Sequence, residues 1–186
     1  MKVLLHICCA PCVIYPLKVL RAEGHELYGF FYNPNIHPYT EFKKRRECLE
    51  EYAVTQGLRV ASEVGYDMEE FLRKVVGSED DRCAMCYEMR LRKTAQAAKD
   101  AGLDAFTSTL LYSRYQKHEL IVQIANVVAA EVGVKFLYRD FRDGWQEGQA
   151  ESREIGMYRQ KHCGCIYSEK ERFMKAGDLS KAVIEG

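Results

Sequence analysis

The sequence lacks long apolar runs, an excess of charge of either sign, and linker-like composition. Apolar stretches such as residues 127–130 are far shorter than the ~20 residues that a membrane-spanning helix needs. The 27 Lys and Arg residues balance the 27 Asp and Glu residues, which excludes a strongly basic coat protein for nucleic acids and an acidic tail. With only four prolines and no repeat among 186 residues, we expect one domain over residues 1–186.

The N-terminus has no apolar segment of the ~7–15 residues typical of a signal peptide, which predicts a cytoplasmic protein with no membrane partner. Structural disulfides are rare in that reducing compartment, so the eight cysteines indicate metal binding or redox chemistry. Cys48 stands alone and fits a small buried hydrophobic residue. The other seven form three groups: Cys8-Cys9-x-x-Cys12, Cys83-x-x-Cys86 and Cys163-Gly164-Cys165.

Short apolar or β-branched runs alternate with longer segments of helical period, which is typical of βαβ units. We therefore predict an α/β fold: a single domain with a mostly parallel sheet of about five strands flanked by helices, Rossmann-like and of the nucleotide alpha-hydrolase (HUP) type. The predicted strands cover residues 2–7, 26–32, 59–64, 105–109 and 135–139.

Helices are predicted over residues 38–56, from Asp67 to Gly77, over 83–101, and up to Gly133. Asp67 and Glu70 have the spacing of a capping box. The last of these helices carries an apolar stripe that should face the sheet. The stripe consists of Leu120, Ile121, Ile124, Val128 and Val132.

The first cysteine group follows the first predicted strand, and open α/β sheets bind ligands beyond the carboxyl ends of their strands. Adjacent cysteines point to opposite faces within a strand, so Cys8 and Cys9 can bind one centre only from the turn that follows it. Cys83 and Cys86 share one face at a helix start. Four such thiolates suit either tetrahedral zinc or an iron–sulfur cluster, and the spacing does not separate the two.

Three cysteines remain beyond a set of four, which indicates chemistry rather than a closed structural site. A disulfide between Cys163 and Cys165 would close a short, strained ring and be labile. This pair is interpreted as a two-electron store or as ligands to a second metal. His162 could tune a neighbouring thiol, whereas His6, inside the first strand, is better explained as a core histidine.

Two further groups have a functional and an ordinary interpretation. Asp80 and Asp81 could bind an extra iron, or could lie at a solvated helix N-terminus. The basic run of residues 43–46 follows Tyr39 and Phe42 and suits RNA phosphates and bases, although three glutamates close behind it also fit a solvated helix face.

Five segments together resemble one known family. They are Leu-Leu-His-Ile-Cys-Cys-Ala-Pro-Cys at residues 4–12, residues 31–38 with Glu41 and Arg45-Arg46, Arg-Cys-x-x-Cys-Tyr-x-x-Arg-Leu at 82–91, Thr-Ser-Thr-Leu at 107–110, and residues 158–165. The chain resembles the epoxyqueuosine reductases of the QueH family over nearly its whole length.

The resemblance implies the last step of tRNA queuosine biosynthesis, in which an epoxide on the cyclopentane of a modified guanine is reduced to the alkene. It implies a [4Fe–4S] cluster on Cys8, Cys9, Cys83 and Cys86, and a redox-active pair of Cys163 and Cys165. It also implies an additional mononuclear iron, for which Cys12 and Asp81 are candidate ligands.

The implied partners are tRNA carrying epoxyqueuosine and an electron donor that the sequence does not identify. The candidate tRNA contacts are Lys43, Lys44, Arg45, Arg46 and Arg82, together with Arg90, Arg114 and Lys117.

Two other classes of protein are alternatives. An ATP-dependent tRNA thiolase or ATP pyrophosphatase would share the parallel core, but the loop after the first strand holds cysteines where a Ser-Gly-Gly-type phosphate loop would be needed. A zinc-stabilised RNA-binding module would use the cysteines only for folding. Zinc is colourless and an iron–sulfur cluster is brown, so the colour of the protein distinguishes the zinc-stabilised module from an iron–sulfur enzyme.

Overall fold

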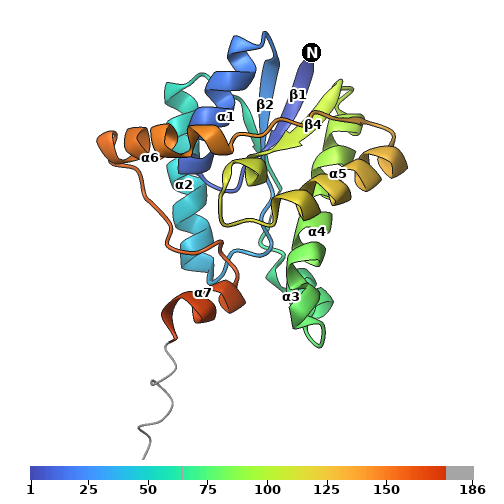
Figure 1. Ribbon diagram of the computed structural model, residues 1–186, viewed down its shortest axis with the longest axis vertical. Coiled ribbons are helices and arrows are strands. Elements are labelled where there is room, and N and C mark those ends of the chain that lie inside the picture. The colour runs from blue at the N-terminus through green and yellow to red at the C-terminus, as the bar shows by residue number, and fades with distance from the viewer. Residues whose placement is uncertain (64, 175–186) are drawn as a thin grey trace, which may run out of the picture.

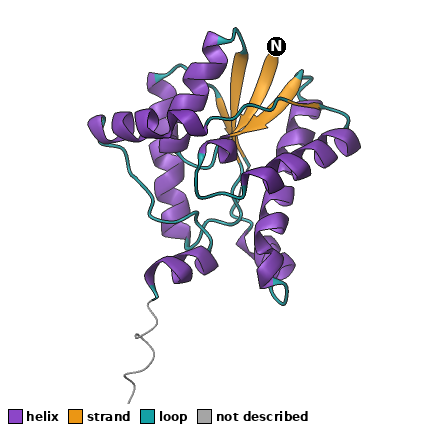
Figure 2. Ribbon diagram, in the orientation of Figure 1, coloured by secondary structure: helices purple, strands orange, loops and turns teal. Residues whose placement is uncertain are grey.

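The computed structural model describes residues 1–63 and 65–174. Its five strands form an all-parallel sheet in the order β3-β2-β1-β4-β5, with helices on both faces (Figures 1 and 2). This confirms the predicted α/β, Rossmann-like class, although every strand is shorter than predicted. The single domain over residues 1–186 includes positions outside the described part and stays a prediction. The strands are β1 (Lys2–His6), β2 (Glu26–Phe31), β3 (Val60–Ser62), β4 (Ala105–Ser108) and β5 (Lys135–Phe136).

The central strand β1 is buried between β2 and β4, which explains its nearly continuous apolar sequence. His6 is the polar exception and is fully buried. Its Nδ1 lies 2.9 Å from Ser108 Oγ, and its Nε2 lies 3.1 Å from the Tyr32 carbonyl oxygen. The histidine is therefore a hydrogen-bonded core residue, as its place inside a strand predicts.

Helices α1, α2 and α6 cover one face of the sheet, and α4 and α5 cover the other (Figure 1). Helix α3 packs against α4, and α7 lies below the lower end of α2 (Figure 1). Among the described residues, no helix combines the length and the apolar character that crossing a membrane requires. The helices are α1 (Ala10–Ala22), α2 (Tyr39–Thr55), α3 (Met68–Val75), α4 (Arg82–Asp100), α5 (His118–Val132), α6 (Trp145–Glu154) and α7 (Ile166–Phe173).

Two helix details differ from the predictions. Asp67 precedes α3 but its side chain caps no amide, because its ψ of 43° departs from the extended conformation of an N-cap residue, so the capping-box prediction is wrong. In the α5 stripe, Ile121, Val128 and Val132 are buried. Leu120 and Ile124 are only partly buried, because much of α5 packs on α4 rather than on the sheet.

After α6 the chain returns across the carboxyl side of the sheet and enters α7 (Figure 1). The His37 amide donates a hydrogen bond of 2.8 Å to the Gly164 carbonyl oxygen, which ties this return segment to the loop between β2 and α2. Gly164 has a φ of +126°, and a Cβ there would lie 2.8 Å from an Ile36 side-chain carbon. Glycine is therefore needed between the two cysteines both for conformation and for space.

Candidate metal and redox site

The turn after β1 lies where the order of the strands reverses, because β2 and β3 follow on one side of β1, and β4 and β5 follow on the other. Such a switch point is where open parallel sheets bind ligands. The Cys8 amide donates to Thr109 Oγ1, 3.1 Å away at the end of β4, and Thr109 Oγ1 lies 3.4 Å from Cys8 Sγ. Cys8 and Cys9 both lie in this turn, as their adjacency predicts.

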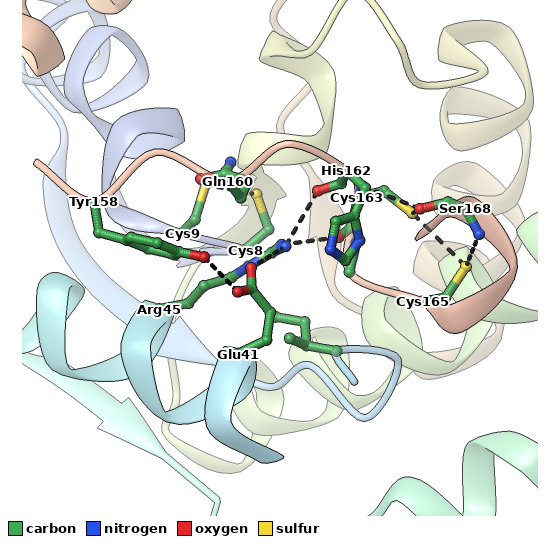
Figure 3. Close-up of polar contacts among 12 residues, drawn as sticks. Cys8, Cys9, Glu41, Arg45, Tyr158, Gln160, His162, Cys163, Cys165 and Ser168 are labelled. Atoms are coloured by element: carbon green, nitrogen blue, oxygen red, sulfur yellow. Dashed lines mark hydrogen bonds and ion pairs between the residues drawn. The ribbon is translucent and has the colours of Figure 1, made fainter. Parts of the chain in front are cut away.

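Three thiols gather at this turn. The Sγ atoms of Cys8 and Cys9 are 3.7 Å apart, and all three Sγ atoms of Cys8, Cys9 and Cys12 lie within 4.8 Å of one another. Sulfurs held at ~2.3 Å around a tetrahedral ion are about 3.8 Å apart, so the spacing and the soft donor chemistry suit a metal. Gln160 covers this group, since its Nε2 donates to Cys9 Sγ over 2.7 Å (Figure 3).

The second cysteine group is contacted by Arg90, which is 3% exposed. Its Nη1 lies 3.7 Å from Cys86 Sγ, and its Nη2 donates to Asn33 Oδ1 over 2.7 Å. Burial opposes the charged form, but negative charge at Cys86, Cys8 and Cys163 raises the pKa of Arg90. Arg90 therefore places a buried positive charge beside the Cys86 thiol.

Cys83 and Cys86 stand in the first turns of α4, as predicted. Burial raises the pKa of Cys86 to about 11. Within the described residues, their sulfurs do not join the close group of Cys8, Cys9 and Cys12. A four-iron cluster spreads its ligand thiolates more widely than a single ion does, so the assignment of Cys8, Cys9, Cys83 and Cys86 to one cluster stays a prediction.

The third group combines one exposed and one buried thiol, Cys163 and Cys165. Their Sγ atoms are 3.8 Å apart. Ser168 contacts both: its Oγ lies 3.0 Å from Cys163 Sγ, and its amide donates to Cys165 Sγ over 3.3 Å (Figure 3). Hydrogen bonding with Cys165 lowers the pKa of Cys163 to about 5, which favours the thiolate at the exposed position.

Arg45 holds the segment that carries Cys163. Its Nη1 donates to the Cys163 carbonyl oxygen over 3.0 Å, and its Nη2 to the His162 carbonyl oxygen over 3.1 Å. Its Nε donates to Glu41, which also accepts a hydrogen bond from Tyr158 (Figure 3). Because Arg45 is 1% exposed and its donors are engaged, we do not retain it among the tRNA contacts.

Replacing Arg45 by Gln is expected to loosen residues 158–165 without unfolding the sheet. Removing one partner of a buried ion pair typically costs about 3–5 kcal/mol, so amide exchange in this segment should accelerate by at least about a hundredfold. Arg46→Gln is the matched control, since it removes only a partly exposed pair with Glu50 and should change exchange little. Hydrogen exchange of residues 158–165 is measured by mass spectrometry in both variants. Equal protection of this segment in the two would refute the role of Arg45.

The remaining predicted residues lie on α2, in the segment before α4, or on α4 itself. Lys43 and Lys44 are exposed on α2, and Arg46 is partly exposed. Arg82 pairs with Glu171 and lies over the Tyr167 ring, which ties α4 to α7. Arg90 is buried, as described above, and is likewise not retained as a tRNA contact. Asp80 and Asp81 are exposed before α4, so the role of Asp81 as an iron ligand stays a prediction, and Cys48 is half-buried on α2.

The sequence reasoning did not assign roles to Gln160, Thr109, Ser168 and Glu41. These residues lie in segments without periodicity or on a helix whose charges resemble a solvated face. A signal existed for Gln160, Glu41 and Thr109, which stand within the segments that carry the family resemblance, whereas Ser168 lies outside them.

The fold and the site together define a Rossmann-like protein with a group of thiols that could hold a metal ion at the position where related folds hold a phosphate loop. The chain belongs to the family described as epoxyqueuosine reductase QueH, whose model matches residues 3–171. This family assignment makes the chain an enzyme of the oxidoreductase class.

Relatives of this description cover nearly the whole chain. The epoxyqueuosine reductase QueH of Dehalococcoides mccartyi is 39% identical over 174 residues, which cover 94% of this chain and 96% of the relative. That of Thermotoga maritima is 36% identical over 189 residues and covers 96% of each chain. The solved structure of a predicted tRNA methyltransferase subunit from Methanocaldococcus jannaschii matches with a TM-score of 0.58 at 11% identity, covering 83% of this chain and 75% of the other, which shows a shared fold only.

Proposed function

We propose that this protein reduces epoxyqueuosine in tRNA to queuosine, using a [4Fe–4S] cluster, an adjacent iron and the cysteine pair of residues 163 and 165. The observation that carries the proposal is the group of three thiols, Cys8, Cys9 and Cys12, whose sulfurs lie within 4.8 Å of one another at the carboxyl edge of the sheet, in a chain of the QueH family. The proposed cluster ligands are Cys8, Cys9, Cys83 and Cys86. The proposed ligands of the additional iron are Cys12 and Asp81.

When bound, these iron centres supply single electrons and a Lewis acid for the epoxide oxygen. The pair of Cys163 and Cys165 can supply the two electrons and two protons that the reaction consumes. Conversion of an epoxide to an alkene and water consumes two electrons and two protons, and oxidation of two thiols to one disulfide releases the same number of each. An external reductant must then restore the thiols.

Several side chains can prepare this site without taking part in electron transfer. Gln160 closes over Cys9 and limits access of water to the thiols. Arg90 offsets the negative charge of thiolates in a buried place. Arg45 fixes the backbone of Cys163, so that the exposed thiol is held in place while the buried one is packed against Phe71 and Met89.

The proposed substrate is tRNA, and four basic residues that are exposed or partly exposed are its proposed contacts. Lys43, Lys44 and Arg46 lie on α2, and Arg82 lies at the start of α4. The proposed location is the cytoplasm, where tRNA is modified.

An anaerobic spectrum with iron, sulfide and zinc analysis tests the proposal, followed by dithionite and epoxyqueuosine-containing tRNA. We expect about four or more irons per chain, a broad absorption that bleaches on reduction, and conversion to queuosine. Stoichiometric zinc without iron or turnover, after anaerobic cluster reconstitution, would instead favour a zinc-stabilised RNA-binding module.

A further inference from the structure

An exposed tyrosine stands on the turn between η2 (Thr109–Tyr112) and α5. Tyr115 is 84% exposed, although burying an aromatic ring normally stabilises a protein. The residues beside it are charged or polar, and Arg114 and Lys117 are both exposed. A solvent-exposed ring between two cations calls for a functional explanation.

The ring is held in position from below. Its centroid lies 5.6 Å from that of Trp145 in an edge-to-face arrangement, and Trp145 in turn packs on Tyr112 at 5.0 Å. The Tyr115 amide donates to Ser113 Oγ over 3.3 Å. The contact with Trp145 restricts the ring, which lowers the entropy lost when a flat ligand binds.

The turn is also anchored beside the thiols. The Tyr87 hydroxyl donates to Gln116 Oε1 over 2.7 Å and accepts from the Lys117 amide over 3.2 Å, and Tyr87 directly follows Cys86. At its other end, η2 begins at Thr109, which contacts Cys8. The turn therefore spans the space between the first and second cysteine groups.

We infer that Tyr115 is a stacking platform for a nucleotide of the tRNA that neighbours the modified base, with Arg114 and Lys117 binding the adjoining phosphates. This inference rests on the proposed function and specifies which residues beside that site bind the tRNA. A base whose side group must reach a recessed metal site has to be splayed out of its strand, and single-stranded RNA is commonly bound by aromatic stacking and basic side chains. RNA is favoured over a protein partner because the cations Arg114 and Lys117, which flank the ring, complement the charge of phosphates.

The test compares three substitutions of Tyr115 in the reconstituted holoenzyme. Tyr115→Ala should weaken binding of epoxyqueuosine-containing tRNA by about 5- to 150-fold, the range typical for loss of one base–aromatic stack. Tyr115→Phe should bind like the wild type, whereas Tyr115→Leu, which retains an apolar contact with Trp145, should bind weakly. Tyr28→Ala is the matched control, because Tyr28 also lies against an arginine, Arg59. Tyr28 lies beside Lys2, the first residue of β1, whereas the thiols follow the last residue of that strand.

Fluorescence anisotropy with labelled tRNA measures the affinity, and turnover with dithionite separates KM from kcat. We expect the change in KM with kcat largely retained. Equal affinity of the Ala variant and the wild type would overturn the inference, as would equal weakening by the Phe and Leu variants. A wild-type holoenzyme that neither binds nor converts the tRNA would overturn the proposed function instead, which makes the two failures distinguishable.

Discussion

Replacing Cys163 or Cys165 by Ser is expected to reduce turnover of epoxyqueuosine-containing tRNA by about a thousandfold or more, in line with the loss of a catalytic group that acts as part of a unit. Serine preserves size and hydrogen bonding but cannot form a disulfide. The segment should keep its conformation, because Arg45 and His37 hold its backbone through carbonyl oxygens that the substitutions leave unchanged.

Cys48→Ser is the matched control for this prediction. Cys48 is half-buried on α2 and belongs to none of the three groups, so its substitution should leave turnover unchanged. Iron per chain, measured on each variant, separates the two interpretations of the pair. Unchanged iron with lost turnover supports a redox pair, lost iron supports metal ligation, and full turnover with intact iron would refute both.

Replacing Cys9 by Ser is expected to remove nearly all bound iron and to lower Tm, because metal that binds only the folded state stabilises it. Cys9 is 1% exposed, lies 3.7 Å from Cys8 in sulfur-to-sulfur distance, and accepts from Gln160. Iron analysis and the visible spectrum after anaerobic reconstitution provide the measurement.

Cys12→Ser makes this experiment more specific. If Cys12 binds only the additional iron, its substitution should leave about four irons and the broad absorption of the cluster, while Cys9→Ser should abolish both. A Cys12 variant that loses all iron would show that the three close thiols form one site. A Cys9 variant with wild-type iron content would contradict the metal site at this turn.

The sequence was sufficient to predict the sheet and the position of the first cysteine group. Runs of apolar residues define buried parallel strands, and the adjacency of Cys8 and Cys9 requires a turn. The sequence also predicted that His6 is a core residue. It did not reveal α1, because the cysteine motif masks a helix that begins with Pro11 near its first position, where proline is favoured.

The role of Arg45 could not be predicted from a run of four cations. Successive helical residues point about 100° apart, so a run of four must direct some members toward the protein, and the sequence does not say which. In α2 the buried member is Arg45, and its partners are the backbone of residues more than a hundred positions later. The contact between Gln160 and Cys9 escaped prediction because it joins an aperiodic segment to a thiol about 150 positions earlier in the sequence.

The segment Cys163-Gly164-Cys165 is attached to both helical layers. From the α2 side it is gripped by Arg45, and on the α3–α4 side Cys165 is embedded among Phe71, Val75 and Met89. The separation of the two sulfurs is therefore mechanically coupled to the relative position of the layers. A core substitution that shifts α2 against α4 by a fraction of an ångström would be transmitted to the thiol pair, even though the altered residue touches neither cysteine.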